Sequence, residues 1–234
     1  MPRAVVLLVL ALALFAAGCG GSDSATETTA SQATETTASQ ATTETSAAPT
    51  ECADVDAPAP REDGGATQPS ERLDPEKTWT LTFDTSCGPF VVTLDVEGAP
   101  ATSASLVSLA RSGFFDDTVF HRIVPGFVIQ GGDPTQSGTG GPGYSTVDRP
   151  PSDAAYVKGV VAMAKTQAEP AGTSGSQFFV VTGDDIGLPP DYAIVGKVTD
   201  GLDVVERIGA LGDPSTEQPL RPVVVRSVTA ASTP

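Results

Sequence analysis

Residue types that bind metal ions or nucleic acids are scarce in this sequence. The chain has 234 residues, with a single histidine, His121, and three cysteines, which leaves too few soft ligands for a metal site. Lysines and arginines number 13 against 29 acidic residues, and the formal net charge is −16. Because phosphate contacts need clustered basic side chains and these are scattered, the composition argues against nucleic-acid binding.

Two glycine-rich segments lack the residues that would make them catalytic loops. Residues 140–146, GGPGYST, contain no lysine and therefore do not match a phosphate-binding loop. Ser174 and Ser176 have no G-x-S-x-G frame and no basic partner nearby in the sequence. The sequence gives no sign of phosphoryl transfer or of serine hydrolase chemistry.

Long hydrophobic runs are also missing. The longest covers residues 4–17, whereas a membrane-spanning helix needs about 20 apolar residues. Arg3 precedes this run and small residues lead to Cys19, which is the order of an export signal. The end resembles a bacterial lipoprotein signal, although Ala16 stands where such signals usually carry Leu. We predict a signal peptide over residues 1–19 with a lipid anchor at Cys19, on the extracytoplasmic membrane face; the alternative is a secretory signal cleaved before Cys19.

Residues 20–76 have no apolar periodicity. They are rich in Thr, Ser, Ala and Glu, and ATETTASQ at residues 25–32 recurs at 33–40. Such a composition buries too little apolar surface to offset the entropy lost on ordering, so a disordered tether is predicted. Outside the cytoplasm a disulfide between Cys52 and Cys87 is expected to pin its end to the domain; two free thiols are the alternative.

Hydrophobic periodicity begins near residue 77 and predicts one folded domain over residues 77–230. Residues 78–84 alternate like a half-buried strand, and helical spacing over 100–112 ends at Gly113. A second helix fits residues 202–208. Further strands are expected over residues 90–96, 119–124, 127–130, 160–164, 177–182, 193–198 and 223–229. Many short strands, two helices and glycine-rich loops favour a mainly β fold, a closed antiparallel barrel.

Residues 120–133, FHRIVPGFVIQGGD, place one cation, Arg122, and one amide, Gln130, in an apolar run. A guanidinium there is costly to desolvate without a partner. Arg122 is therefore either paired for structural reasons or available to a ligand.

This run and four later blocks resemble the signature of the cyclophilins, which are peptidyl-prolyl cis-trans isomerases. The later blocks are GTGG at 138–141, VAMAKT at 161–166, GTSGSQFFV at 172–180 and YAIVGKV at 192–198. They occur in the family's order and with similar spacing. The resemblance implies an eight-stranded closed antiparallel barrel capped by two helices, with the substrate groove on its outer surface.

The chemistry gives an independent reason for Arg122 and Gln130. Amide resonance opposes rotation about an X-Pro bond with a barrier of ~18–20 kcal/mol. Twisting the bond localises a lone pair on the prolyl nitrogen, so a donor aimed there favours the twisted state. Arg122 is expected to be that donor and Gln130 to hold the flanking carbonyl, with no cofactor or metal. The resemblance assigns substrate contacts to Phe127, Val128, Met163, Lys165, Gln177, Phe179, Leu188 and Tyr192.

Competing interpretations stay open at this point. Taken singly, Phe127, Met163 and Phe179 are more typical of a core than of a binding site, and His121 is expected to be structural. The leading hypothesis is a monomeric, membrane-tethered isomerase that assists folding of exported, proline-containing polypeptides. The alternatives are a non-catalytic proline-peptide-binding chaperone module and a lipoprotein that holds small ligands inside its barrel, although bulky apolar strands predict a filled lumen.

Overall fold

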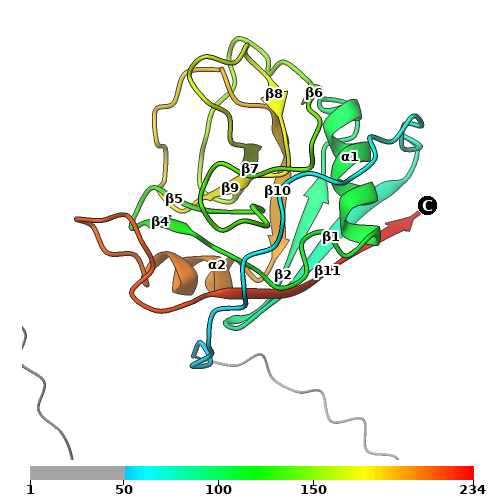
Figure 1. Ribbon diagram of the computed structural model, residues 1–234. Coiled ribbons are helices and arrows are strands. Elements are labelled where there is room, and N and C mark those ends of the chain that lie inside the picture. Colours follow the sequence, from blue (N-terminus) through cyan, green and yellow to red (C-terminus); the bar gives the residue numbers. More distant parts are fainter. Residues whose placement is uncertain (1–50) are drawn as a thin grey trace, which may run out of the picture. The chain divides into compact units, whose positions relative to one another are not determined.

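The computed structural model describes residues 51–234 (Figure 1). The predictions made for residues 1–50, including the signal peptide and the lipid anchor at Cys19, lie outside the described residues. Two helices, α1 and α2, accompany a mainly β architecture, as predicted. Neither helix is long and apolar enough to cross a bilayer.

The strands form one large antiparallel sheet and one small one. The large sheet has nine strands in the order β3-β11-β1-β2-β10-β7-β9-β5-β4, and the small sheet pairs β6 with β8. The elements in chain order are β1 (Thr78–Thr85), β2 (Gly88–Leu94), α1 (Pro100–Arg111), β3 (Thr118–Val119), β4 (Arg122–Val124), β5 (Val128–Gly131), β6 (Thr146–Val147), β7 (Val160–Met163), β8 (Thr173–Ser174), β9 (Phe178–Val181), β10 (Ile194–Asp200), α2 (Leu202–Gly209) and β11 (Val224–Thr233).

The large sheet curves into a half-barrel, and its two edge strands do not pair with each other to close it. Its edge strands, β3 and β4, are consecutive in the chain and separated only by Phe120 and His121. At this break the amide of Phe120 donates to the carbonyl of Val223 (3.0 Å), whereas the amide of Ile123 donates to the carbonyl of Glu217 (2.9 Å). The outer side of β4 thus meets a loop and not a strand. The predicted closed, eight-stranded barrel is therefore wrong: the sheet is open and has nine strands.

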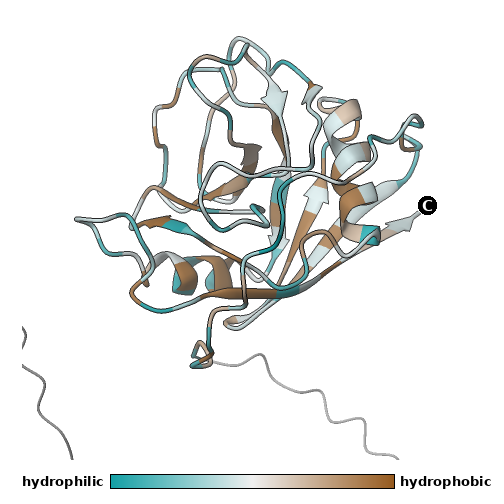
Figure 2. Cartoon of the chain, in the orientation of Figure 1, coloured by the Kyte–Doolittle hydropathy of each residue, from teal (hydrophilic) through white to brown (hydrophobic). Residues whose placement is uncertain are grey.

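The interior of the half-barrel is filled by apolar side chains. Along β1 every second residue is buried, and hydrophobic positions recur along β1, β2 and α2 in Figure 2. Phe178 lies against three other rings, with centroid distances of 5.1 Å to Phe83, 6.2 Å to Phe115 and 6.1 Å to Phe120. This packing leaves the outer surface as the place for a substrate and disfavours the ligand-holding lumen.

Local chemistry sets the ends of both helices. Pro100 occupies the first turn of α1, where a missing amide proton costs nothing. The chain leaves α1 through Gly113 (φ 71°) and enters α2 through Gly201 (φ 75°), a backbone region that favours glycine. A β-carbon on Gly201 would also lie 2.5 Å from the carbonyl oxygen of Pro89.

Residues 51–76 contain no helix or strand, yet they are held against the domain. A disulfide joins Cys52 to Cys87. Residues 51–66, here called the strap, run along the domain in blue and cyan in Figure 1. Their backbone amides donate to the loop over residues 134–142 through the pairs Arg61 to Pro134 (2.8 Å), Gly64 to Gly141 (2.9 Å) and Ala66 to Pro142 (3.1 Å).

This placement differs from the predicted disordered tether reaching residue 76. Leu73 packs on the core, and the indole Nε1 of Trp79 donates to the carbonyl of Asp74 (3.0 Å). Backbone hydrogen bonds and a covalent link offset the ordering entropy here, and neither leaves a trace in hydrophobic periodicity.

Candidate active site

Cross-strand register brings Arg122 and Gln130 together on the outer face of the sheet. Arg122 on β4 lies opposite Gln130 on β5, which in turn lies opposite Phe179 on β9. Because side chains alternate along a strand, the neighbouring Ile123 and Ile129 point the other way, and both are 0% exposed. One surface therefore carries a cation, an amide and an aromatic ring in adjacent positions.

A cleft of about 290 Å³ lies over this surface. Most of the residues that the resemblance assigned to the site line it. The lining comprises Arg122, Phe127, Val128, Gln130, Ala164, Lys165, Phe179, Leu188 and Tyr192. Apolar side chains and a few polar groups converge there, as in a site that binds an apolar ring next to an amide.

Two of the predicted contacts lie elsewhere. Met163 is 0% exposed, because it pairs with Phe178 across β7 and β9 on the core side of the sheet. Gln177 lines the neighbouring pocket instead of the cleft. Ala164, which sequence reasoning did not single out, lines both cavities.

Arg122 is held by an ion pair without being withdrawn from the cleft. Its Nε donates to Oε2 of Glu217 at 2.7 Å, and its Nη1 lies 3.4 Å from Oε1 of Gln130. The remaining amino group, Nη2, has no hydrogen-bond partner within residues 51–234. The ion pair thus fixes the inner end of the guanidinium and leaves a donor available to a ligand.

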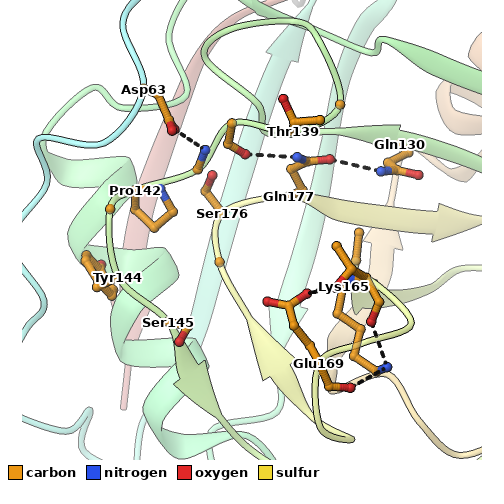
Figure 3. Close-up of a pocket in the computed structure, with 17 residues that line it drawn as sticks. Asp63, Gln130, Thr139, Pro142, Tyr144, Ser145, Lys165, Glu169, Ser176 and Gln177 are labelled. Carbon is orange, nitrogen blue, oxygen red and sulfur yellow. Dashed lines mark hydrogen bonds between the residues drawn. The ribbon is translucent and has the colours of Figure 1, made fainter.

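Gln130 is oriented by a chain of hydrogen bonds that runs through Gln177 (Figure 3). Its Nε2 donates to Oε1 of Gln177 (3.0 Å), and Nε2 of Gln177 donates to the carbonyl of Gly140 (2.9 Å). Since the amide nitrogen of Gln130 is committed to Gln177, its oxygen faces Arg122. Gln177 therefore contacts Gln130 without lining the cleft itself.

His121 lies next to Arg122 in sequence and is half-buried, with both ring nitrogens shielded from solvent. Burial lowers the pKa of His121, although the nearby carboxylate of Asp133 opposes this shift. Within residues 51–234, neither ring nitrogen has a hydrogen-bond partner. Burial alone would raise the pKa of Asp133, but hydrogen bonds from Thr135, Gly140 and Gly138 outweigh it and lower that pKa. A neutral, enclosed imidazole fits the structural role expected for His121.

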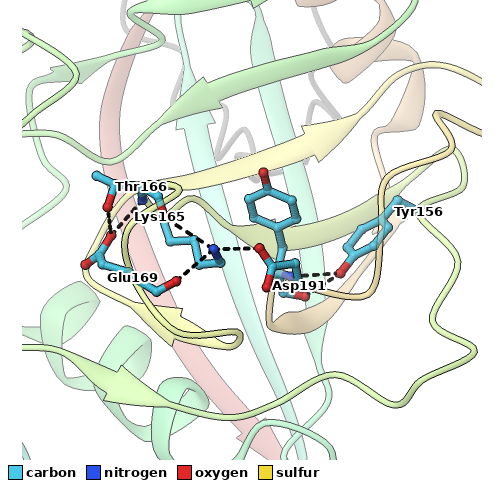
Figure 4. A network of polar contacts seen from close by, with 6 residues as sticks. Tyr156, Lys165, Thr166, Glu169 and Asp191 are labelled. Carbon is cyan, nitrogen blue, oxygen red and sulfur yellow. Dashed lines mark hydrogen bonds and ion pairs between the residues drawn. The ribbon is translucent and has the colours of Figure 1, made fainter.

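Lys165 lines the cleft with its aliphatic stem, whereas its ammonium group is paired with groups of the protein itself (Figure 4). Its Nζ pairs with the carboxylate of Asp191 at 2.6 Å, and only 2% of its side chain is exposed. The ammonium also lies 5.5 Å from the ring centroid of Tyr192. The hydroxyl of Tyr156 donates to the carbonyl of Tyr192 (2.7 Å) and accepts from its amide (3.0 Å). This network fixes one wall of the cleft.

The cleft offers donors and apolar surface for a bond rotation. Within residues 51–234, no group of three or more histidine, cysteine, aspartate or glutamate side chains is arranged to hold a metal ion. The family model described as cyclophilin type peptidyl-prolyl cis-trans isomerase/CLD matches residues 80–230. The chain belongs to the cyclophilin-type peptidyl-prolyl cis-trans isomerases.

Relatives of this cyclophilin come from distant organisms. It is 38% identical to peptidyl-prolyl cis-trans isomerase A of Mycobacterium tuberculosis over 172 residues, covering 66% of this chain and 93% of the relative. It is 35% identical over 149 residues to CYP18-2 of Arabidopsis thaliana, covering 62% and 89% of the two chains. A crystal structure of a Cryptosporidium parvum cyclophilin superposes with a TM-score of 0.61 at 28% identity, covering 67% of this chain and 99% of that one.

Glu217 is the neighbour of the cyclophilin cleft that sequence reasoning missed. It lies 95 residues after Arg122, in the loop that follows α2. Its backbone adopts φ 60° and its carbonyl accepts from Ile123 on β4. The signature blocks do not include this loop, so the sequence alone held no signal for the ion pair.

Proposed function

We propose that this cyclophilin works outside the cytoplasm, at the membrane face, where it assists the folding of exported polypeptides. Two observations favour this location. Residues 1–19 have the order of an export signal ending at Cys19, and a disulfide joins Cys52 to Cys87, a bond that persists mainly in oxidising compartments. One chain supplies the whole cleft, so a monomer suffices.

The observation that carries the mechanism is the guanidinium of Arg122 at the edge of an apolar cleft. When a substrate X-Pro bond twists, resonance is lost and a lone pair gathers on the prolyl nitrogen. A donor from Arg122 binds that nitrogen more strongly in the twisted state than in either planar state, which lowers the rotational barrier. Glu217 limits the positions of the guanidinium and so reduces the cost of aligning it.

The rest of the cleft restricts which part of the substrate rotates. Phe127, Val128 and Phe179 offer an apolar seat for the proline ring, and Gln130 presents a polar group beside it. Holding the ring while the preceding carbonyl turns is the geometry that Arg122 needs. The Cryptosporidium parvum cyclophilin was also crystallised in the presence of the dipeptide Ala-Pro (TM-score 0.60, 28% identity), which favours proline-containing substrates here.

A cis-trans peptide assay with the full chain tests this mechanism. Arg122→Ala is expected to lower kcat/KM by about 10²-fold, the usual cost of losing one transition-state donor. Arg226→Ala is the matched control, since it breaks a comparable exposed ion pair with Asp84 (3.6 Å) far from the cleft lining. Peptide binding that persists with no catalysis in the wild-type protein would favour the chaperone module instead.

The location is tested by the mass of the protein purified from its native host. Acylation at Cys19 is expected to add the mass of a diacylglyceryl group and a fatty acyl chain, and Cys19→Ser is expected to release the protein from membranes. An unmodified chain beginning at Cys19 or beyond would point to plain secretion.

A further inference from the structure

A second, larger cavity of about 520 Å³ adjoins the proline cleft (Figure 3). Its floor is the glycine-rich backbone over residues 138–143, which leaves space where side chains would otherwise project. Its walls include several polar side chains, among them Thr139, Tyr144, Ser145 and Gln177. A polar, roomy cavity of this kind suits a long side chain with a hydrophilic end better than an apolar one.

The strap supplies one wall of this cavity. Asp63 lines it, and its Oδ1 accepts a hydrogen bond from the amide of Gly141 at 2.7 Å. The next residue, Gly64, donates its amide to the carbonyl of Gly141 (2.9 Å). These two hydrogen bonds hold the side chain of Asp63 and the backbone that follows it. The second carboxylate oxygen of Asp63, Oδ2, remains open to a ligand.

The cavity carries an excess of negative charge. Glu169 also lines it; its Oε2 accepts from the amide and hydroxyl of Thr166 (2.6 and 2.8 Å), and Oε1 is left over. The one cation in the lining, Lys165, is paired with Asp191. Two carboxylates therefore face the cavity without a mobile counter-charge among its lining residues.

The two cavities are adjacent and share part of their walls. Gln130, Ala164 and Lys165 line both, so a peptide whose proline occupies the cleft passes beside the larger cavity within a few residues. An extended chain advances ~3.3–3.6 Å per residue, which allows a long neighbouring side chain to enter it.

We propose that the larger cavity is a specificity subsite for a lysine or arginine side chain near the substrate proline, and that Asp63 of the strap is its selecting residue. A cationic head would pair with Asp63 and Glu169, while its methylene stem would lie along the glycine-rich floor. An acidic side chain would meet like charge. The inference rests on the isomerase activity proposed above.

The test compares kcat/KM for matched peptides that carry Lys, Ala or Glu at each position within three residues of the proline, using the full chain. We expect the Lys peptide to exceed the Glu peptide at one or more positions by about two- to fivefold, the range of exposed ion pairs. The preference should shrink as salt is raised from 0.02 to about 0.5 M. Asp63→Asn keeps an acceptor for Gly141 and should lower the Lys/Glu ratio at that position.

Matched variants separate charge selection from a general effect. Glu62→Gln removes the same charge from the adjacent strap residue, which does not line the cavity, and should leave the Lys/Glu ratio unchanged. Kinetics on the Ala peptide should match the wild type in Glu62→Gln. A ratio that Asp63→Asn leaves intact would overturn the inference, whereas absent activity on the Ala peptide in the wild type would overturn the proposed function itself.

Discussion

Removing the Cys52–Cys87 disulfide should destabilise the domain by about 4 kcal/mol. The bond spans a sequence separation of 35, and in the chain-entropy model a closed loop of that length lowers the entropy of the unfolded chain by about 13 cal/mol/K. Cys87 is 0% exposed and Cys52 8%, so Cys→Ala at both positions avoids burying a new polar group. The loss would be a quarter or more of the stability of a typical domain.

Equilibrium urea unfolding of the full chain measures this loss. The double variant should unfold at lower urea, with a melting temperature lower by roughly 10 °C, and reductant should shift the wild type but not the variant. Isomerase kinetics in the absence of urea should not change, because neither cysteine lines the cleft. A difference in unfolding free energy below about 1 kcal/mol would refute the reasoning. The disulfide would then add little to the hydrogen bonds that hold the strap.

Three further perturbations test the site and its surroundings. Glu217→Ala frees the guanidinium of Arg122 and should lower kcat/KM by roughly tenfold, while stability changes by less than about 1 kcal/mol because the pair is 34% and 48% exposed; an unchanged rate would argue against positioning. His121 has a lowered pKa when folded, so the unfolded state binds more protons below about pH 6.5 and stability should fall as the pH drops from 7 to 5.5. His121→Asn should flatten that slope in urea titrations, and a slope that persists would assign it to another group. Met163→Ala should cost about 2–5 kcal/mol of stability as a core truncation with a much smaller effect on KM than Phe179→Ala; the reverse order would return Met163 to the cleft.

The repeating parts of the fold could be predicted because their signals are local. Alternation over residues 78–84 and helical spacing over 100–112 each reflect burial of one face, which the sequence displays directly. The structure has these elements as β1 at Thr78–Thr85 and α1 at Pro100–Arg111. Gly113 ends the first helix as its backbone freedom suggested.

Barrel closure could not be predicted because it depends on a distant loop. Whether β4 meets a strand or a loop is decided by Glu217 and its neighbours, which no pattern around residues 118–124 indicates. The ion pair of Glu217 with Arg122 could not be predicted for the same reason, because the two residues lie far apart in the sequence.

The error at Met163 has a different origin, since local information was available. Strand parity places residues 161 and 163 on one side and 162 on the other. Val161 and Met163 pair with Val180 and Phe178 on the core side. The resemblance places Met163 in the pocket, whereas the alternation of side chains along the strand predicts that Met163 points into the core.

The position of the disulfide also has a mechanical consequence. If the chain is anchored at Cys19 as proposed, any pull from the membrane travels along the residues that precede Cys52. It then reaches a covalent link to Cys87 before it reaches residues 53–66. Tension is therefore delivered to the body of the domain at the start of β2, and the strap with Asp63 is spared the peeling force that would strip it from the substrate site.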